Sequence, residues 1–528
     1  MFLGIFLVNN DNISYIILVG TIKYLLKNKV TMKKIIIDKN YWQTRIATTR
    51  DNKLQNIYFY SHAQKSIERI FFKGKVTKVL PGIQTAFVDI GQEKAGFLHI
   101  SEIDRELAFD RLIEGKEASK TKRRSQVLDI GKILKEGEPI LVQVSKEPIY
   151  EKGAKLTTCF TLPGRFIVLM PNIPRIGVSK KIEDREERAR LKELVSKTLP
   201  SGMGAIIRTT SENRKQKEIT RDIRFLIETW EAINKKFITA ETAERLHEDL
   251  PMPLRVVRDH LDDDVSQIIV NDKEEQKRIY KFVKHIASEH SQKIKLYQEP
   301  PPVFHHFNIE KQIEQALEKK VELRSGGSLI IETTEAMTVI DVNTGKFVGK
   351  KTLEDTILKT NLEAAEEIAR QLRLRNIGGL IVIDFIDMAV PDHRRQLIRL
   401  FEKTLKERDK FQSVVLKVSE FGLVQMTRKR SGKTLIQQLK YDCPHCAGLG
   451  HIKSVQTEAY TILRDLKLYL QEKRIKKSIE LFLSEQTFDY ITSVEYNSIL
   501  QLEKDFKCQI TLIQEKNFSL NQYKIKKI

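Results

Sequence analysis

The chain has 528 residues, which is long enough for several domains, and its hydrophobic content of 41% is ordinary for a folded protein. Its 91 lysines and arginines exceed its 70 aspartates and glutamates, so the formal net charge is +21. Such a charge favours a polyanionic partner, most often nucleic acid, and no long basic amphipathic helix supports an anionic membrane instead. Four cysteines are too few for a disulfide framework and suit a reducing compartment.

Residues 1–31 differ from the rest because two apolar runs, FLGIFLV and ISYIILVG, are separated by polar residues. No basic region precedes the first run, and neither run reaches the roughly 18 residues that a membrane span needs. Met32 begins the segment MKKIIIDK. We expect translation to begin there; the alternative is that residues 1–31 form a dispensable, poorly ordered extension.

The segment that follows residue 71 predicts a small β-barrel, because turn signals separate short alternating strands in FKGKVTKVLPGIQTAFVDIGQEKAGFLHISEI. We expect closure by EPILVQVSKE after a basic insert, KEASKTKRR, which is either a solvated loop or a nucleic-acid contact. The pattern resembles the S1-type OB fold, which binds single strands on aromatic rings in a basic groove. Lys73, Lys75 and Lys78 supply charge. Phe87 and Phe97 are the candidate rings, although each alone is more typical of a core.

Between about residues 148 and 213, the apolar strand AIIRTT ends in Arg208, Thr209 and Thr210. A guanidinium fork beside hydroxyl groups can hold a terminal phosphate from several directions. Taken by itself, however, the pattern is that of an ordinary strand end.

Two strand-like runs, AMTVIDVN and GGLIVIDF, carry Asp341 and Asp384 near their ends. A helix is predicted between them, because apolar residues recur with the period of one helix face. These residues are Leu353, Ile357, Ala364, Ala365, Ile368 and Leu372. Thr352 is the expected N-cap, and Gly378 with Gly379 is expected to end the helix.

Strand alternation places Asp341 and Asn343 on one face of the first run. In the second run, continuous apolar residues from Leu380 to Ile383 predict a strand buried on both sides. Two carboxylates that converge at strand ends suit Mg²⁺, which typically takes only one or two carboxylates from a protein. The alternative is that each aspartate is a strand-end cap or a loop residue.

Near the C-terminus, FGLVQMTRKR ends in the basic series Arg428, Lys429 and Arg430. Further on, DCPHCAGLGH places Cys443 and Cys446 at the spacing of a metal knuckle. A redox C-x-x-C motif is the competing interpretation, but we expect no thioredoxin-like βαβ context. The segment from residue 453 onward alternates helical and strand patterns and is interpreted as an association domain.

Four stretches together resemble the catalytic region of the ribonuclease E/G family. They are TEAMTVIDVNTGKFVGK, NLEAAEEIARQLRLRNIGGLIVIDFIDM, FGLVQMTRKR and CPHCAGLG. NTGKFVGK and MTRKR are more similar to the short, G-type branch. The resemblance implies that Asp341 and Asp384 bind the catalytic Mg²⁺, with Asn343 assisting. It also implies that Phe87 and Phe97 stack bases.

The same resemblance implies a pocket that reads the 5′-monophosphate of RNA through Arg208 and Thr209. Lys152, Gly164 and Val168 match other positions that line this pocket or its approach. One departure is that Lys180 and Lys181 stand where some members of the family have an arginine pair. Because lysine lacks the bidentate fork of arginine, the geometry there is in doubt.

Placed after a Mg²⁺ site, the series Arg428, Lys429 and Arg430 is expected to hold the RNA backbone. Structural Zn²⁺ needs four ligands, and Cys443 with Cys446 offers two. The simplest completion is the same pair from a second subunit, which is also the arrangement of the family. A histidine-completed site using His445 and His451 within one chain is the alternative.

The implied fold is an α+β multidomain protein with an S1-type OB barrel inserted in an RNase H-like subdomain. The expected segments are an extension (1–31), the RNase H-like structural subdomain (32–70 and 216–295), the S1-type OB domain (71–148), a 5′-sensor region (149–215), a DNase I-like catalytic domain (296–440), a zinc-link (441–450) and a small C-terminal α/β association domain (451–528).

The sequence therefore predicts a Mg²⁺-dependent endoribonuclease that cleaves single-stranded RNA in rRNA processing and mRNA decay. A/U-rich sites and a preference for a 5′-monophosphate are implied by the family alone. The rival hypotheses are a non-catalytic RNA-binding or ribosome-associated protein, and an exonuclease with a similar metal site.

The expected assembly is a homodimer through the zinc-link, or a homotetramer built from it, with an RNA-degradation complex containing an exoribonuclease as a further partner. No stable membrane insertion is expected. The Lys- and Ile-rich composition favours a plastid-encoded protein in the chloroplast stroma, with the bacterial cytoplasm as the alternative.

Overall fold

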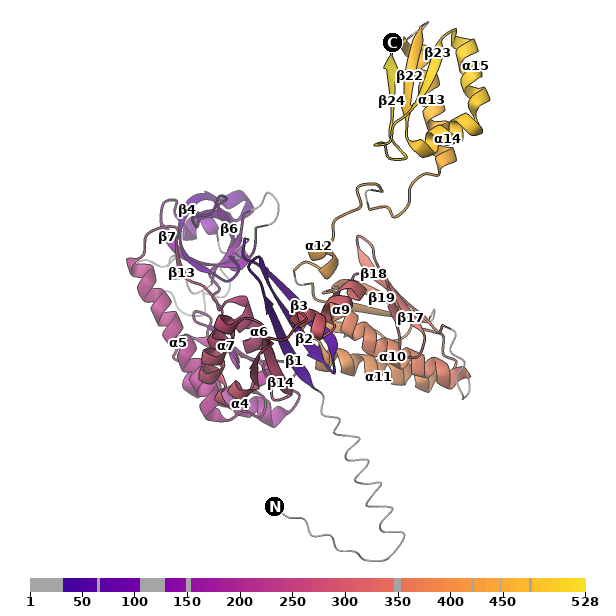
Figure 1. Cartoon of the computed structure of the whole chain (residues 1–528). Coiled ribbons are helices and arrows are strands. Elements are labelled where there is room, and N and C mark those ends of the chain that lie inside the picture. The colour runs from indigo at the N-terminus through magenta and orange to yellow at the C-terminus, as the bar shows by residue number, and fades with distance from the viewer. Residues whose placement is uncertain are drawn as a thin grey trace, which may run out of the picture. The chain divides into compact units, whose positions relative to one another are not determined.

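The computed structural model describes nine segments of the chain, which form two compact units that divide at Gly432 (Figure 1). The segments are residues 32–63, 67–104, 129–148, 153–345, 353–419, 422–430, 432–446, 448–473 and 477–528. Lys152, Thr352, the insert KEASKTKRR and the extension 1–31 lie outside the described residues. The expectation of an α+β multidomain fold is confirmed.

A five-stranded sheet is shared by two distant segments of the first unit. Its strands lie in the order β15-β14-β1-β2-β3, with β1–β2 and β2–β3 antiparallel and the β1–β14 and β14–β15 pairs parallel. The strands are β1 (Lys33–Lys39), β2 (Gln43–Arg50), β3 (Lys53–Ser61), β14 (Val265–Val270) and β15 (Ile294–Leu296). Helices α6 (Met252–His260) and α7 (Lys273–Ile286) share its core, and η5 (Ser288–Lys293) precedes β15. Residues 33–61 and 252–296 thus share one core, while the RNase H-like character of this subdomain stays a prediction.

A closed barrel of five strands follows in the order β4-β5-β6-β8-β7, and a β4–β7 pair completes the ring. Its elements are β4 (Phe71–Leu80), η1 (Pro81–Ile83), β5 (Thr85–Asp89), β6 (Gly96–His99), η2 (Ile100–Glu102), α3 (Ile130–Ile133), β7 (Pro139–Lys146) and β8 (Lys155–Thr157). Alternate apolar side chains such as Val76, Val88 and Leu98 fill the interior. β8 lies beyond residue 148, where the sequence analysis ended the barrel.

The next segment forms a four-stranded sheet in the order β11-β12-β10-β9. Its elements are β9 (Leu162–Pro163), β10 (Ile167–Met170), β11 (Ile176–Val178), α4 (Arg185–Thr198), β12 (Gly204–Ile207) and η4 (Thr209–Ser211). The long helix α5 (Gln216–Thr239) buries Ile223, Leu226 and Trp230 in the core of this sheet, and β13 (Glu244–His247) extends the barrel beside β4. The assignment of residues 216–247 to the five-stranded subdomain is therefore corrected.

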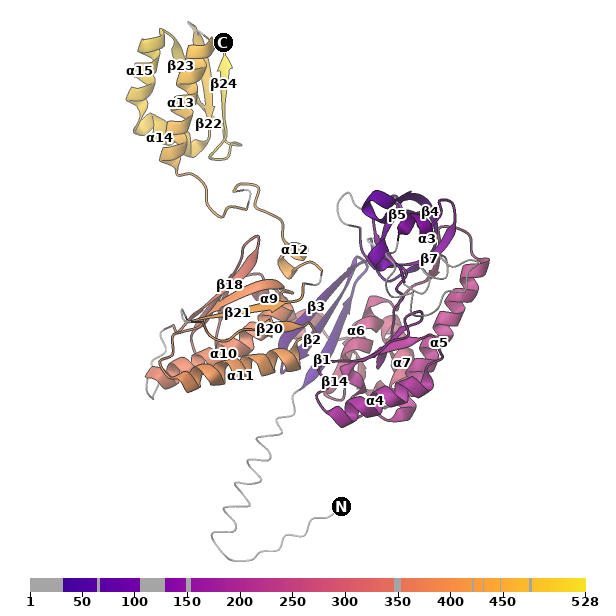
Figure 2. The same cartoon turned by 180° about the vertical axis from the view of Figure 1, so that it is seen from behind.

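A six-stranded sheet in the order β16-β17-β18-β19-β21-β20 contains both conspicuous aspartates. Its elements are α8 (Val303–His306), α9 (Ile309–Ala316), β16 (Lys320–Glu322), β17 (Ser328–Thr333), β18 (Met337–Asn343), α10 (Leu353–Leu374), β19 (Gly379–Asp384), α11 (Pro391–Arg408), β20 (Ser413–Val415) and β21 (Leu423–Arg428). β18 and β19 are parallel because α10 connects them, and the other pairs are antiparallel. Figure 2 shows α10 and α11 side by side against one face of the sheet.

The predicted helix between the two aspartates is confirmed as α10, with two corrections at its ends. The side chain of Leu353 is 77% exposed, so the core contacts begin at Ile357. The helix ends before the glycines: Asn376 takes the left-handed conformation with φ of 53°, and the Ile377 N–H donates to the Leu372 carbonyl. Gly379 instead begins β19.

The prediction that Leu380–Ile383 is buried on both sides is wrong. Ile381 and Ile383 are buried under the helices, but Leu380 is 41% exposed and Val382 is half-buried on the opposite face. A continuous apolar run cannot distinguish one covered face from two. We call this uncovered side of the six-stranded sheet the open face.

The second unit holds the C-terminal fold and the cysteine pair. Its elements are α12 (Leu435–Leu439), α13 (Val455–Lys473), β22 (Ser478–Leu483), α14 (Glu485–Ser493), α15 (Tyr496–Phe506), β23 (Gln509–Gln514) and β24 (Tyr523–Lys527). β22 and β23 are parallel and joined by α14 and α15, so a βαβ unit is present after all. The cysteines precede it by the whole of α13 and do not lie at its strand-to-helix turn. In the part of the chain that the structure describes, no helix is long and apolar enough to cross a membrane.

Candidate functional site

Asp341 and Asp384 lie directly opposite each other in the parallel β18–β19 ladder. Side chains that are paired in this way point to the same face of a sheet, and both aspartates are exposed on the open face. Asn343, two residues after Asp341, shares that face and donates from its amide nitrogen to Asp341 Oδ2 at 2.8 Å. The structure thus brings together the three residues that the sequence predicts for the metal site.

The charge around these residues suits a cation. Partial desolvation, with contributions from the carboxylates of Asp341 and Asp387, raises the pKa of Asp384. A positive ion between the two carboxylates would relieve this repulsion. Among the described residues, no group of three or more His, Cys, Asp or Glu side chains could hold a metal. Two carboxylates fit Mg²⁺, which keeps several waters and needs few protein ligands.

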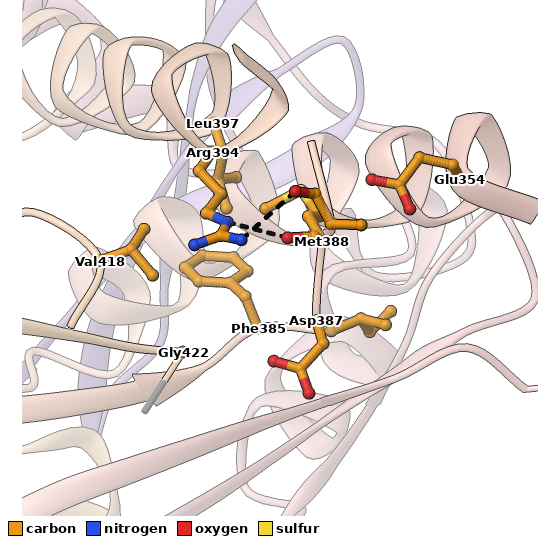
Figure 3. Close-up of a pocket in the computed structure, with 10 residues that line it drawn as sticks. Glu354, Phe385, Asp387, Met388, Arg394, Leu397, Val418 and Gly422 are labelled. Atoms are coloured by element: carbon orange, nitrogen blue, oxygen red, sulfur yellow. Dashed lines mark hydrogen bonds between the residues drawn. The ribbon is translucent and has the colours of Figure 1, made fainter. Parts of the chain in front are cut away.

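A cavity of about 530 Å³ lies beside the end of β19 and is lined by the loop that follows Asp384 (Figure 3). Arg394 donates from Nε to the Met388 carbonyl at 2.8 Å and so ties this loop to α11. Asn361 of α10 is fully buried and binds the backbone of Ile386 in both directions, at 2.8 and 3.1 Å. The sequence analysis missed Asn361, although a polar residue on an apolar helix face was the available signal.

The outer surface of the barrel carries a row of four side chains across four strands. Register places Lys78 beside Phe87, Phe87 beside Phe97, and Phe97 beside Lys155. Both rings are half-buried rather than in the core, so they are available for stacking, and the lysines flank them. Lys155, which also pairs with Glu102, was missed because its strand was not recognised as part of the barrel.

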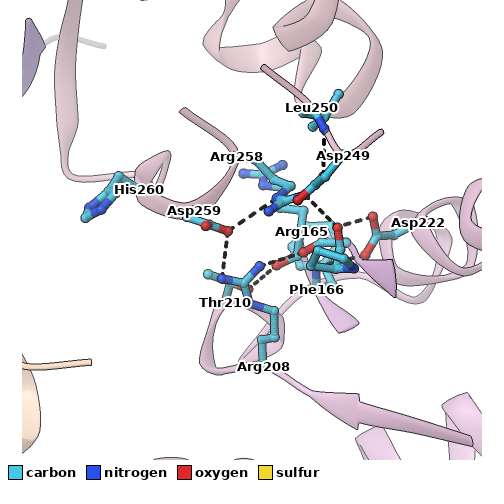
Figure 4. Close-up of polar contacts among 12 residues, drawn as sticks. Arg165, Phe166, Arg208, Thr210, Asp222, Asp249, Leu250, Arg258, Asp259 and His260 are labelled. Carbon is cyan, nitrogen blue, oxygen red and sulfur yellow. Dashed lines mark hydrogen bonds and ion pairs between the residues drawn. The ribbon is translucent and has the colours of Figure 1, made fainter. Parts of the chain in front are cut away.

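Arg208 lies where β12 meets η4, in a dense set of polar contacts (Figure 4). It donates from Nη1 to the Gly164 carbonyl at 2.6 Å and from Nη2 to Asp259 Oδ1 at 2.8 Å. Although burial opposes ionisation, Arg208 and Arg258 hold the pKa of Asp259 well below its usual range. Arg208 is therefore held in one orientation, and its side chain remains 23% exposed.

The other residues expected around Arg208 take different roles. Thr209 is exposed beside it, whereas the Thr210 hydroxyl donates to the Arg165 carbonyl at 2.6 Å and is used within the fold. A Cβ at Gly164 would lie 2.5 Å from Asp222 Oδ2 and 2.8 Å from Leu226 Cδ1, so the close approach of these α5 side chains requires glycine. Val168 is half-buried on β10. The structure thus gathers Arg208, Thr209 and Gly164, while Lys152 lies outside the described residues.

Lys181, one of the two lysines that depart from the family pattern, makes its contacts within the fold. Lys181 donates to the main-chain carbonyls of Lys406 and Asp409, at the C-terminal end of α11. A cation there complements the negative end of the helix dipole. Lys181 therefore caps the C-terminal end of α11.

Arg428 does not form part of an exposed basic series, so this prediction is corrected. Its side chain is 1% exposed and donates two hydrogen bonds to the Asp409 carboxylate, from Nε at 2.5 Å and from Nη2 at 3.0 Å. Nη1 donates to the Ile377 carbonyl. Lys429 and Arg430 are exposed and remain candidates for RNA contact.

Cys443 and Cys446 lie on one tight turn of the second unit. The backbone N–H groups of Cys446 and His445 lower the pKa of the Cys443 thiol, which favours the thiolate that binds metals. The Gly450 N–H donates to Cys446 Sγ at 3.3 Å. The two sulfurs fit half of a tetrahedral zinc site, and within the described residues no third ligand completes it.

Comparison with protein families matches residues 161–431 to "Ribonuclease E/G family", residues 71–150 to "S1 RNA binding domain" and residues 442–528 to "RNase E/G, Thioredoxin-like domain". Ribonuclease G of Escherichia coli (strain K12) is 40% identical over 433 residues, which cover 82% of this chain and 87% of that relative. Ribonuclease G of Haemophilus influenzae is 38% identical over 87% of this chain and 91% of its own length. Ribonuclease E of Escherichia coli (strain K12) is 36% identical over 85% of this chain, but over 41% of its own length.

Proposed function

Because the chain belongs to the ribonuclease E/G family, we propose that it is a Mg²⁺-dependent endoribonuclease acting on single-stranded RNA. The observation that carries the proposal is the in-register pair of Asp341 and Asp384 on the open face. The S1 barrel in the same chain supplies a row of aromatic and basic side chains for a single strand. A purely RNA-binding protein would need that row but not the two facing carboxylates.

In this mechanism, Asp341 and Asp384 would hold Mg²⁺, and Asn343 keeps the Asp341 carboxylate in position through its hydrogen bond. When bound, the ion supplies an activated water and stabilises charge at the scissile phosphate. The loop fixed by Asn361 keeps the end of β19 rigid, so that Asp384 stays in register with Asp341. The phenylalanines of the barrel bind bases, and the exposed Lys429 and Arg430 attract the RNA backbone.

The direct test is cleavage of a short unstructured RNA, labelled at both ends, with Mg²⁺ present or omitted. Internal cuts that need Mg²⁺ and leave a 5′-phosphate and a 3′-hydroxyl support the endoribonuclease. Mononucleotide release would indicate an exonuclease, and binding without cleavage would indicate the rival RNA-binding protein. Varying the base composition of the same RNA tests the preference for A/U-rich sites.

We also propose that Arg208 and Thr209 bind the 5′-monophosphate of the RNA. Arg208→Ala is expected to remove most of the advantage of a 5′-monophosphate over a 5′-hydroxyl. A charge-assisted hydrogen bond to a charged group contributes about 1.5–3 kcal/mol, which corresponds to roughly 10–150-fold in relative rate. Initial cleavage rates on the two substrates measure it.

Thr210→Val is the matched control, since it changes the neighbouring hydroxyl, which is used within the fold. It should keep the preference for the monophosphate. Equal rates of the unmutated protein on both substrates would show that this pocket does not read the 5′ end.

We further propose that two chains share one Zn²⁺ through Cys443 and Cys446, forming a homodimer that can pair into a tetramer. Cys443→Ser with Cys446→Ser should then lower zinc content and shift the protein towards monomer, because metal binding and dimerisation are linked. Sedimentation analysis with zinc determination measures both quantities. Cys508→Ser, outside the turn, is the control. One ion per chain in a stable monomer would favour the site completed by His445 and His451.

The remaining proposals concern the setting of the enzyme. We propose a role in rRNA processing and mRNA decay, with an exoribonuclease as a further partner, in the plastid stroma or a bacterial cytoplasm. Co-purification from the source organism with RNA sequencing of an Asp384→Asn strain would test these points together.

A further inference from the structure

The turn between β1 and β2 exposes two large aromatic side chains next to each other. Tyr41 is 99% exposed and Trp42 is 70% exposed. Within the described segments, neither side chain makes a hydrogen bond or ring contact with the rest of the chain. Rings of this size are usually at least partly buried, so a paired exposure calls for a ligand.

This turn is an ordered platform. The Asn40 N–H donates to the Gln43 carbonyl at 3.0 Å, and the His62 N–H donates to the Trp42 carbonyl at 3.3 Å. Gln43 pairs with Ser61 in the antiparallel β2–β3 ladder. The backbone that carries both rings is therefore fixed to the end of the five-stranded sheet, and a ligand would meet them with little loss of backbone entropy.

Hydrogen bonds and strand pairing connect this sheet end to the aromatic row of the barrel. Shortly after His62, the Ile67 and Glu68 N–H groups both donate to Glu147 Oε1 at 2.9 Å, just beyond β7. The residue before Glu147, Lys146, pairs with Lys155 of β8. Lys155 in turn pairs with Phe97. The aromatic row is thus joined through Lys155, Lys146 and Glu147 to Ile67, which follows His62 by five residues.

We propose that Tyr41 and Trp42 form an additional stacking site for bases of single-stranded RNA, continuous with the S1 barrel. This inference rests on the proposed function. Asn40 and Gln43 flank the two rings in the chain, and the His62 N–H donates to the Trp42 carbonyl; all three residues are polar and can bind base edges. A binding site for a protein partner is expected to have a packed apolar centre, whereas a base needs only a flat ring on which to stack.

The two tryptophans of the chain make the site directly observable. Trp230 is 9% exposed, with ring centroids 5.3 Å from Phe160 and 6.3 Å from Phe71, so a bound RNA cannot reach it. Titration of the full chain with an unstructured uridine-rich 12-mer, carrying a 5′-hydroxyl and without Mg²⁺, should quench the emission of Trp42. Trp42→Phe should bind the same RNA with no quenching.

Affinity separates stacking from mere proximity. Tyr41→Ala with Trp42→Ala should weaken binding of the 12-mer about tenfold or more, since a stacked base carries a large share of such binding. Tyr41→Phe with Trp42→Phe should stay within about twofold, because the rings are kept. Tyr280→Ala, which removes a 41% exposed ring from α7, is the matched control and should change nothing. Circular dichroism should be unchanged in every variant, because all three side chains are exposed.

The outcomes distinguish this inference from the proposed function. If the unmutated protein binds no single-stranded RNA, the proposed function itself fails. If it binds the 12-mer but shows no quenching, or if the double alanine variant binds equally well, the stacking site is overturned while the ribonuclease proposal stands.

Discussion

Replacing Asp384 by asparagine is expected to lower the rate of RNA cleavage by on the order of 10²–10⁴-fold, because metal-ion catalysis is worth several kcal/mol. The change removes one of the two charges that face each other across β18 and β19 but keeps the size of the side chain. RNA affinity should stay within about twofold, since the barrel and the exposed basic residues are untouched. Single-turnover cleavage and fluorescence anisotropy on one labelled RNA measure the two effects.

Glu332→Gln is the control for this experiment. Glu332 lies on β17, on the same open face, and pairs at the surface with Lys319. The substitution therefore removes one negative charge, as Asp384→Asn does, but at a position away from the aspartate pair. Exposed ion pairs contribute little, and cleavage should change by less than about threefold. Full activity of Asp384→Asn with Mg²⁺ as the sole divalent ion would refute the assignment of the metal site.

The metal site could be predicted because its information is local. Alternation along AMTVIDVN places Asp341 and Asn343 on one face, and the strand is confirmed as β18. What the sequence does not contain is the register that sets Asp341 opposite Asp384, since pairing between strands depends on the packing of α10 beneath them. The exposure of Leu380 was missed for the same reason, because whether a second layer covers a sheet is decided by distant segments.

Boundaries between subdomains were the least predictable part. β8 closes the barrel although it lies after residue 148, where the barrel was expected to end. It has three residues, and so short a strand carries too weak a periodic signal to be recognised. Helix α5 is amphipathic, but its sequence does not say which of two neighbouring sheets receives its apolar face. Such choices are settled by tertiary packing and not by local propensity.

The burial of Arg428 was indicated by strand alternation, but the run of three basic residues favoured the opposite interpretation. In LVQMTR, the period of two places Arg428 on the same side as Val424 and Met426, both buried against the helices. The run of three basic residues nevertheless suggested one exposed surface. The partner that makes burial possible, Asp409, lies 19 residues earlier in the chain, where no local pattern marks it.

Replacing Arg428 by alanine is therefore expected to act on stability. It should lower the free energy of unfolding of the first unit by about 3–5 kcal/mol, because it leaves a buried carboxylate without its partner. Asp409 has a side chain that is 1% exposed, and solvent cannot replace the lost guanidinium. Urea denaturation followed by circular dichroism measures the loss. Arg428→Met with Asp409→Leu should recover most of it, since an apolar pair of similar volume leaves no charge uncompensated.

Lys429→Ala is the matched comparison, because Lys429 follows Arg428 directly and is exposed. It should change stability by less than about 0.5 kcal/mol, as surface substitutions usually do. It should instead weaken RNA binding and reduce the dependence of log affinity on log salt by about one, the effect of losing one phosphate contact. The opposite result, with Arg428→Ala folding normally and losing RNA, would return Arg428 to the RNA-binding surface. The contrast between adjacent residues follows from strand alternation alone, which turns one basic side chain into the core and the next towards solvent.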